Sequence, residues 1–203
     1  TNYIDPKGQF GIAGAAVGSA MTGMIPIADV QYNDFLFCMM DQMANQAAKM
    51  TYMSGGQVKV PMVMRAPVGA TTRGAQHAQS LEGFFTHVPG LKVVCPSTAY
   101  DAKGLLKTAV RDDNPVMVFE HKLLYGSKGN RAEKSALSPE GEVPEEEYLI
   151  PFGDAAIRRE GTDVTIVANL LMSYKVQEAA EELAKEGISV EVIDPRSLVP
   201  FDY

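Results

Sequence analysis

Hydrophobic and polar positions along the chain alternate between two patterns, which predict strands separated by helices. Short apolar runs flanked by turn residues are typical of buried strands, whereas apolar residues three and four positions apart predict helices. The expected strands cover 26–30, 60–64, 91–95, 116–119, 164–168 and 190–194. The expected helices cover 11–23, 34–50, 81–87, 100–111 and 174–186. This alternation favours an α/β fold whose mostly parallel sheet is flanked by helices on both faces.

The first two expected helices differ in character. Small residues spaced three and four apart, including Gly11, Gly14 and Gly18, give the first helix a face that another backbone can approach closely. No strand precedes these glycines, so we reject a dinucleotide-binding fingerprint. The second helix is amphipathic. Its expected inner side consists of Phe35, Cys38, Met39, Gln42, Met43 and Gln46.

Composition changes after the fourth expected strand. Residues 122–147 are rich in glycine and charge and contain prolines, which is typical of a linker. We therefore expect one domain over residues 1–137 and the start of a second over 138–203. The second part holds one βαβ unit, which cannot close a sheet by itself, so we expect this domain to be truncated here.

Charge and cysteine content narrow the class of protein. The net charge of −7 and the absence of a basic cluster argue against a nucleic-acid or anionic-membrane surface. No secretory signal or membrane-length apolar run is found, so we expect a cytoplasmic protein. Cys38 and Cys95 lack metal-site spacing and are expected to be reduced core residues. The 11 methionines fit either this chain's own core or a subunit interface.

The segment from Arg65 to Ser80 is the strongest candidate for chemistry. It joins an expected strand to an expected helix, and such loops lie at the carboxyl ends of strands, where α/β folds place their sites. It carries His77, one of three histidines in the chain. His77 is therefore a candidate catalytic residue. The alternative is a helix-entry loop with an incidental histidine.

Six segments, in this order, resemble one protein family. They are 11–23, Tyr-Met-Ser-Gly-Gly at 52–56, Gly-Ala-Gln-His-Ala-Gln-Ser at 74–80, 89–94, 101–106 and Glu-His-Lys-Leu-Leu-Tyr at 120–125. With them the chain resembles the β subunit of the E1 component of 2-oxo acid dehydrogenase complexes. Gly-Ala-Gln-His is more similar to the pyruvate and acetoin branches than to the branched-chain branch. The resemblance implies a thiamine-diphosphate-binding fold, with a pyrimidine-binding domain followed by a transketolase C-terminal-like domain.

The resemblance also implies partners and an activity. In the family, an E1 α subunit holds the diphosphate and Mg²⁺, two α and two β subunits form a heterotetramer, and an E2 lipoyl acyltransferase receives the acyl group. The implied reaction is oxidative decarboxylation of a 2-oxo acid, with pyruvate the first choice and cleavage of acetoin the alternative. The implied location is the cytoplasm, or the mitochondrial matrix in a eukaryote.

Residue roles follow from the resemblance position by position. His77 matches the histidine beside the thiazolium, Phe35 the aromatic residue that packs on the aminopyrimidine, and Gln31 a residue lining the same pocket. Four further positions match a structural potassium site formed mostly by backbone carbonyls, a donor type that suits a hard cation. They are Met62, Ala109, Asp112 and Asn114. For Asp112 and Asn114, a plain helix stop with turn-forming side chains is the alternative.

Gln9 is the one departure from the family pattern at a reacting position. The family has a glutamate here that bonds the pyrimidine N1′ and serves acid/base chemistry. An amide can bond the ring but cannot relay the proton. Three explanations remain open: the register slips before Gly11, residues are missing from this chain, or the protein is a catalytically impaired scaffold subunit.

Overall fold

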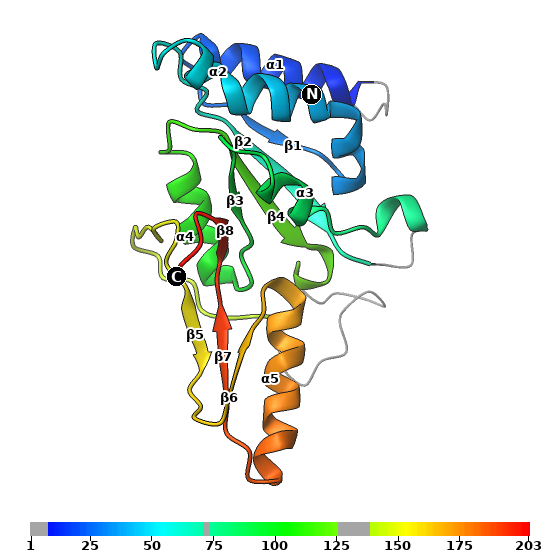
Figure 1. The fold of residues 1–203 in the computed structure, drawn as a ribbon, viewed down its shortest axis with the longest axis vertical. Coiled ribbons are helices and arrows are strands. Elements are labelled where there is room, and N and C mark those ends of the chain that lie inside the picture. The colour runs from blue at the N-terminus through cyan, green and yellow to red at the C-terminus, as the bar shows by residue number, and fades with distance from the viewer. Residues whose placement is uncertain (1–7, 71–73, 126–138) are drawn as a thin grey trace.

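A computed structural model describes residues 8–70, 74–125 and 139–203, which form two sheets that lie end to end (Figure 1). The larger sheet has five strands in the order β1-β2-β4-β3-β8, and the smaller has three in the order β5-β7-β6. The strands are β1 (Ile27–Asp29), β2 (Val63–Val68), β3 (Lys92–Val94), β4 (Val116–His121), β5 (Ala156–Arg159), β6 (Val164–Val167), β7 (Val190–Asp194) and β8 (Ser197–Val199). The domain boundary expected at 137/138 falls outside the described residues.

Strand pairing confirms the expected parallel sheet. β1, β2, β4 and β3 run parallel to their neighbours, and only β8 pairs antiparallel, at the edge beside β3. In the smaller sheet, β6 and β7 form the expected parallel pair, and β5 adds an antiparallel edge. The sequence analysis missed β5 and β8. Both are short, and neither has an apolar run of four residues.

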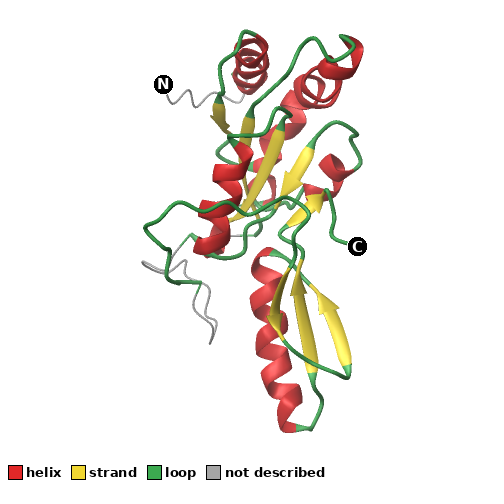
Figure 2. Ribbon diagram, turned by 90° about the vertical axis from the view of Figure 1, so that its left-hand side faces the viewer, coloured by secondary structure: helices red, strands yellow, loops and turns green. Residues whose placement is uncertain are grey.

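Helices cover both faces of the larger sheet. One face packs against α1 (Gln9–Met21), the helical segment 33–53 and α3 (Glu82–Thr86), and the opposite face packs against α4 (Ala99–Ala109). The smaller sheet carries α5 (Leu170–Lys185) on one side (Figure 2). In the part of the chain that the structure describes, no helix is long and apolar enough to cross a membrane.

The segment 33–53 is helical as expected but changes geometry twice. It begins as the 3₁₀ helix η1 (Asn33–Met39), continues as the π-helix η2 (Asp41–Ala47) and ends as α2 (Ala48–Met53). A 3₁₀ helix repeats every three residues, so Leu36 and Met39 are buried. The 3.6-residue period used for the prediction had placed Cys38 in the core. That prediction is wrong, because Cys38 is exposed, whereas Cys95 is buried as expected.

Strand β2 is longer than predicted at its carboxyl end. The expected strand ended at Met64, but parallel pairing with β4 continues from Val63 to Val68. Pro67 does not end the strand. The last β2 residue that pairs with β1 is Arg65, so Pro67 lies past the end of β1, where no ladder bond needs its missing N–H.

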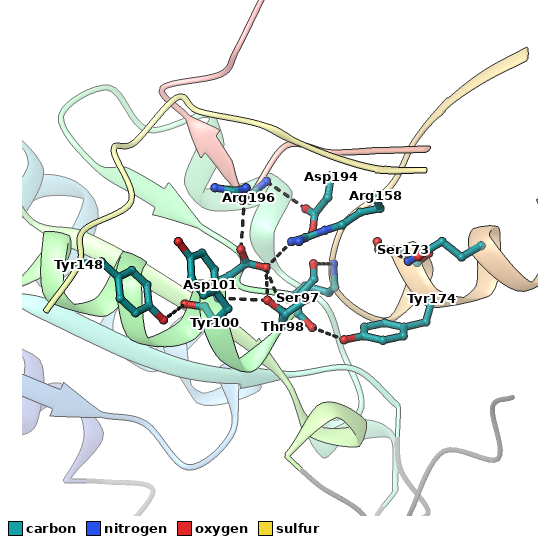
Figure 3. A network of polar contacts seen from close by, with 12 residues as sticks. Ser97, Thr98, Tyr100, Asp101, Tyr148, Arg158, Ser173, Tyr174, Asp194 and Arg196 are labelled. Atoms are coloured by element: carbon teal, nitrogen blue, oxygen red, sulfur yellow. Dashed lines mark hydrogen bonds and ion pairs between the residues drawn. The ribbon is translucent and has the colours of Figure 1, made fainter. Parts of the chain in front are cut away.

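A buried charge cluster joins the two sheets (Figure 3). Asp101, from the first turn of α4, and Asp194, from the end of β7, are both fully buried. Arg158 of β5 donates to both carboxylates, and its Nη2 lies 2.8 Å from Asp194 Oδ2. Arg196 Nε lies 3.3 Å from Asp101 Oδ1. The negative charges of two carboxylates and the positive charges of two guanidinium groups therefore neutralise one another where the two sheets meet.

A second contact fixes the start of α5 to the larger sheet. The Ser97 hydroxyl accepts the N–H of Leu170 at 2.8 Å, and the Tyr174 hydroxyl donates to the Ser97 carbonyl at 2.9 Å. Ser97 follows β3 and precedes the N-cap of α4. The smaller sheet is therefore bound to the larger one in two places. The charge cluster binds its strands, and Ser97 binds its helix α5.

We expect Arg158→Met to lower the free energy of unfolding by about 3 to 5 kcal/mol, because it leaves Asp101 and Asp194 buried with one base between them. Chemical denaturation followed by circular dichroism measures this change. Lys185→Met is the matched control, since it removes an exposed pair with Glu182 and should cost less than about 0.5 kcal/mol. Equal effects of the two substitutions would contradict a structural role for the cluster.

Candidate functional site

Three aromatic side chains meet at the carboxyl ends of β1 and β2. Tyr32 and Phe35 follow β1, and His77 lies in the short 3₁₀ helix η3 (Ala75–His77) that follows β2. The His77 ring centroid lies 4.5 Å from that of Tyr32 and 5.5 Å from that of Phe35, and both pairs are edge-to-face. Such contacts are attractive. All three residues are half-buried, so each keeps accessible surface. The structure thus brings together His77 and Phe35, two of the residues selected from sequence.

A glycine turn returns the His77 loop to the sheet. Gly69 directly follows β2 and has a φ of +91°, and a Cβ there would lie 2.0 Å from His121 Nε2. The position therefore requires glycine. The Gly69 N–H donates to the Gln79 carbonyl at 3.0 Å, so the two ends of the loop are hydrogen-bonded to each other.

Lys122 supports the cluster from the end of β4. Its Nζ donates to the His77 carbonyl at 2.6 Å and lies 5.0 Å from the Tyr32 ring centroid. Burial lowers the pKa of Lys122, while the charge of Asp34 opposes that change. The sequence analysis selected neither Tyr32 nor Lys122. The signals were the ring three positions before Phe35 and the Glu-His-Lys segment at the end of the fourth strand.

Gln31 lies beside the aromatic cluster rather than inside it. It is exposed and lines a cavity of about 440 Å³ that Tyr32 also borders. The other lining residues are Asp29, Arg65, Pro67 and Tyr125. Tyr32 borders this cavity and also contacts the Phe35 ring, so the cavity that Gln31 lines adjoins the aromatic cluster.

An ion-paired network surrounds Arg65 in that cavity. Arg65 donates to both Glu120 oxygens, at 2.9 and 2.7 Å, and to Asp29 at 3.1 Å. The Tyr125 hydroxyl donates to Glu120 at 2.6 Å. The hydrogen bond to Glu120 raises the pKa of Arg65, and burial together with its own bond to Glu120 raises that of Tyr125. The arginine therefore stays charged and the phenol protonated.

The structure places Gln9 only as the first residue of α1. Its side chain lies outside the described part of the chain. The assignment of Gln9 to the cofactor therefore stays a prediction.

The four predicted potassium positions surround the start of β4. The Met62 carbonyl accepts the Val116 N–H at 2.9 Å, and the Ala109 carbonyl accepts the Asp112 N–H at 3.3 Å. Asp112 Oδ1 accepts the side-chain and backbone N–H groups of Asn114, and Oδ2 bonds Lys92. Within the described ranges, no cluster of three or more His, Cys, Asp or Glu side chains could hold a metal. A carbonyl-based potassium site stays a prediction.

Comparison with known families identifies the family of this fold. The family described as "Transketolase, pyrimidine binding domain" matches residues 10–128, and "Transketolase, C-terminal domain" matches residues 153–203. The chain therefore belongs to the transketolase pyrimidine-binding family. This agrees with the fold and family expected from sequence.

The relatives refine this class. The chain is 52% identical over 198 residues to the "Acetoin:2,6-dichlorophenolindophenol oxidoreductase subunit beta" of Cupriavidus necator, covering 97% of this chain and 55% of that protein. It is 43% identical over 201 residues to the "Pyruvate dehydrogenase E1 component subunit beta" of Bacillus subtilis, covering 98% and 58%. The resemblance to E1 β subunits is thereby confirmed. The chain spans little more than half the length of these relatives.

A solved structure agrees with the fold. The chain matches the "Split gene transketolase, inactive beta4 tetramer" with a TM-score of 0.73 and 26% identity, over 96% of this chain and 56% of that one. The match extends over both sheets, because it includes nearly all of this chain.

Asp112, one of the predicted potassium positions before β4, gives the fold a testable acid dependence. Burial would raise its pKa, but hydrogen bonds from Lys92 and Asn114 outweigh this and lower the pKa. Because the folded pKa lies below the unfolded value of about 3.9, the carboxylate stabilises the fold above that pH. Its contribution is lost as the pH falls through the folded pKa. We expect Asp112→Asn to cost about 1.5 kcal/mol of unfolding free energy at pH 7 and progressively less below pH 4.

Urea denaturation at pH 7, 4 and 3 measures this dependence. Asp113→Asn is the control, because its pair with Lys59 is exposed and should contribute less than about 0.5 kcal/mol. If the free-energy cost of Asp112→Asn stayed constant with pH, this would contradict a lowered pKa for Asp112 in the folded protein.

Proposed function

We propose that this chain is the pyrimidine-binding part of a β subunit of a thiamine-diphosphate-dependent E1 enzyme. The observation that carries the proposal is the meeting of His77, Phe35 and Tyr32 at one edge of the sheet. The similarity to β subunits of acetoin- and pyruvate-type enzymes supports it.

The aromatic cluster suits the ring end of such a cofactor. Phe35 is half-buried, and stacking on a rigid aromatic side chain holds a flat heterocycle at low entropic cost. Gln31 offers an amide beside the same region. We assign the diphosphate and Mg²⁺ to an α subunit, as the family resemblance implies, so that the complete site lies between two subunits.

The bound cofactor supplies a carbon nucleophile and accepts the electron pair released by carbon–carbon cleavage. We assign His77 to orient the substrate carbonyl and to hold or move a proton near the reacting carbon. Lys122 fixes the backbone of His77 through the carbonyl bond at 2.6 Å. We assign Gln9 to bond the aminopyrimidine edge, as the family resemblance implies for the position where the family uses a carboxylate.

Pyruvate and acetoin are the two substrates we propose. Both place a carbonyl carbon next to the bond that breaks, and both leave a two-carbon unit for transfer to the lipoyl group of E2. Pyruvate follows from the family resemblance. Acetoin is favoured by identity, which is 52% to an acetoin-type β subunit against 43% to a pyruvate-type one. The assembly we propose contains two α and two β subunits.

Reconstitution of the full-length protein with its α subunit tests the proposal. We expect thiamine-diphosphate-dependent reduction of 2,6-dichlorophenolindophenol with pyruvate or acetoin, and release of carbon dioxide or acetaldehyde distinguishes the substrates. An inactive wild-type complex that Gln9→Glu restores would instead identify a scaffold subunit without a proton relay. Inactivity of both proteins would contradict the proposed function.

We expect His77→Ala to lower kcat by about 10²- to 10⁴-fold in the assembled enzyme, because it removes a proton-transferring group at the reacting carbon. Cofactor affinity, measured by calorimetric titration, should change little, since Phe35 remains. His87→Ala is the control, because His87 is exposed and follows α3. A loss of cofactor affinity as large as the loss of rate would count against the role of His77.

A further inference from the structure

A buried polar pair separates Tyr32 from Phe35 in the sequence. Asn33 is fully buried and Asp34 is 6% exposed, and they occupy the two positions between Tyr32 and Phe35. Buried amides and carboxylates are stable only when hydrogen-bonded. Their partners therefore show what the pair does.

Asn33 binds the segment that follows His77 through its side chain. Its Nδ2 donates to the Gln79 carbonyl at 2.9 Å, and its Oδ1 accepts the Leu81 N–H at 3.0 Å. Both partners lie far from Asn33 in sequence, so these bonds are not part of a local turn. The second proton of Nδ2 is donated to Asp34 Oδ2 at 3.0 Å.

Asp34 binds the same segment through its carboxylate. Its Oδ1 accepts the Gln79 side-chain amide at 2.8 Å and the Gln79 backbone N–H at 3.3 Å. With the bond from Asn33, the carboxylate accepts three hydrogen bonds and donates none. Only an acceptor fits here, because every neighbouring group in these contacts is a donor.

We propose that Asn33 and Asp34 are positioning residues for His77. One short stretch of chain presents Tyr32 and Phe35 to the imidazole and also grips the backbone two to four residues beyond it. The imidazole is thereby fixed relative to the same rings that it contacts. The effect on rate rests on the proposed function, whereas the effect on the place of His77 does not. A displacement of about 1 Å in such a group costs about 10²-fold in rate.

Two substitutions separate positioning from simple folding. Asp34→Asn keeps the size of the side chain but turns an NH₂ group toward one of its donors. Gln79→Ala removes only the Gln79 side-chain bond to Asp34 from an exposed residue, so it should fold even if Asp34→Asn does not. Asp41→Asn is the matched control, because Asp41 is exposed on the same helical segment and accepts hydrogen bonds from Gln42 and Asn45 of that segment.

The measurements use the assembled full-length enzyme. We expect amide exchange over residues 78–82 to accelerate at least tenfold in Asp34→Asn and less in Gln79→Ala, with a shifted His77 imidazole NMR signal in both. We expect kcat to fall by about 10²-fold and severalfold, respectively, with KM for the substrate changing less than threefold. Asp41→Asn should match wild type in all readouts.

Several outcomes would overturn the proposal. Unchanged exchange and an unchanged His77 signal would exclude a positioning role, whether or not the enzyme turns over. Faster exchange with unaltered kcat in an active enzyme would leave only a structural role. If Asp34→Asn fails to fold, Gln79→Ala alone decides by the same criteria. If the wild-type complex shows no turnover, the proposed function fails, and exchange and the NMR signal still decide the placement of His77.

Discussion

The parallel register between β1 and β2 is the constraint on which the site depends. Ile27 pairs with Val63 and Asp29 with Arg65, so both strands point toward the same edge of the sheet. The chain that leaves β1 and the chain that leaves β2 must therefore emerge side by side. An antiparallel pair would send Phe35 and His77 to opposite ends of the sheet. The aromatic cluster is thus a consequence of strand direction before any side-chain contact forms.

Local pattern predicted the four parallel strands of this sheet and the loop that carries His77, and a family resemblance added Phe35, but neither could give the geometry of segment 33–53. Periodicity assumed 3.6 residues per turn, whereas the chain adopts 3₁₀ and then π geometry, which exposes Cys38. The extension of β2 to Val68 was also hidden, because it depends on pairing with β4 and on where β1 ends. Both errors arise where tertiary partners, rather than local sequence, decide the backbone.

Buried polar residues were the other feature that sequence could not reveal. From sequence, Asn33 and Asp34 are typical of an ordinary turn or helix start. Asp101 is typical of a helix-capping residue, and it does cap α4. Their second partners are Gln79 and Arg158, which lie far away along the chain. The burial of such groups becomes visible only after the fold has brought their partners to them.

The exposed surface beside the cluster also bears on how the site is completed. Tyr32, Phe35 and His77 keep part of their surface accessible, and Phe37 and Phe84 form an edge-to-face pair 5.3 Å apart while remaining 43% and 55% exposed. Exposed aromatic residues in close contact are typical of surfaces that a partner covers. The described residues of this chain bury Tyr32, Phe35 and His77 only partly, so a site on this chain alone would leave part of their surface open. The α subunit that we propose would cover this remaining surface, and the same closure would exclude water from the carbon where the proposed chemistry occurs.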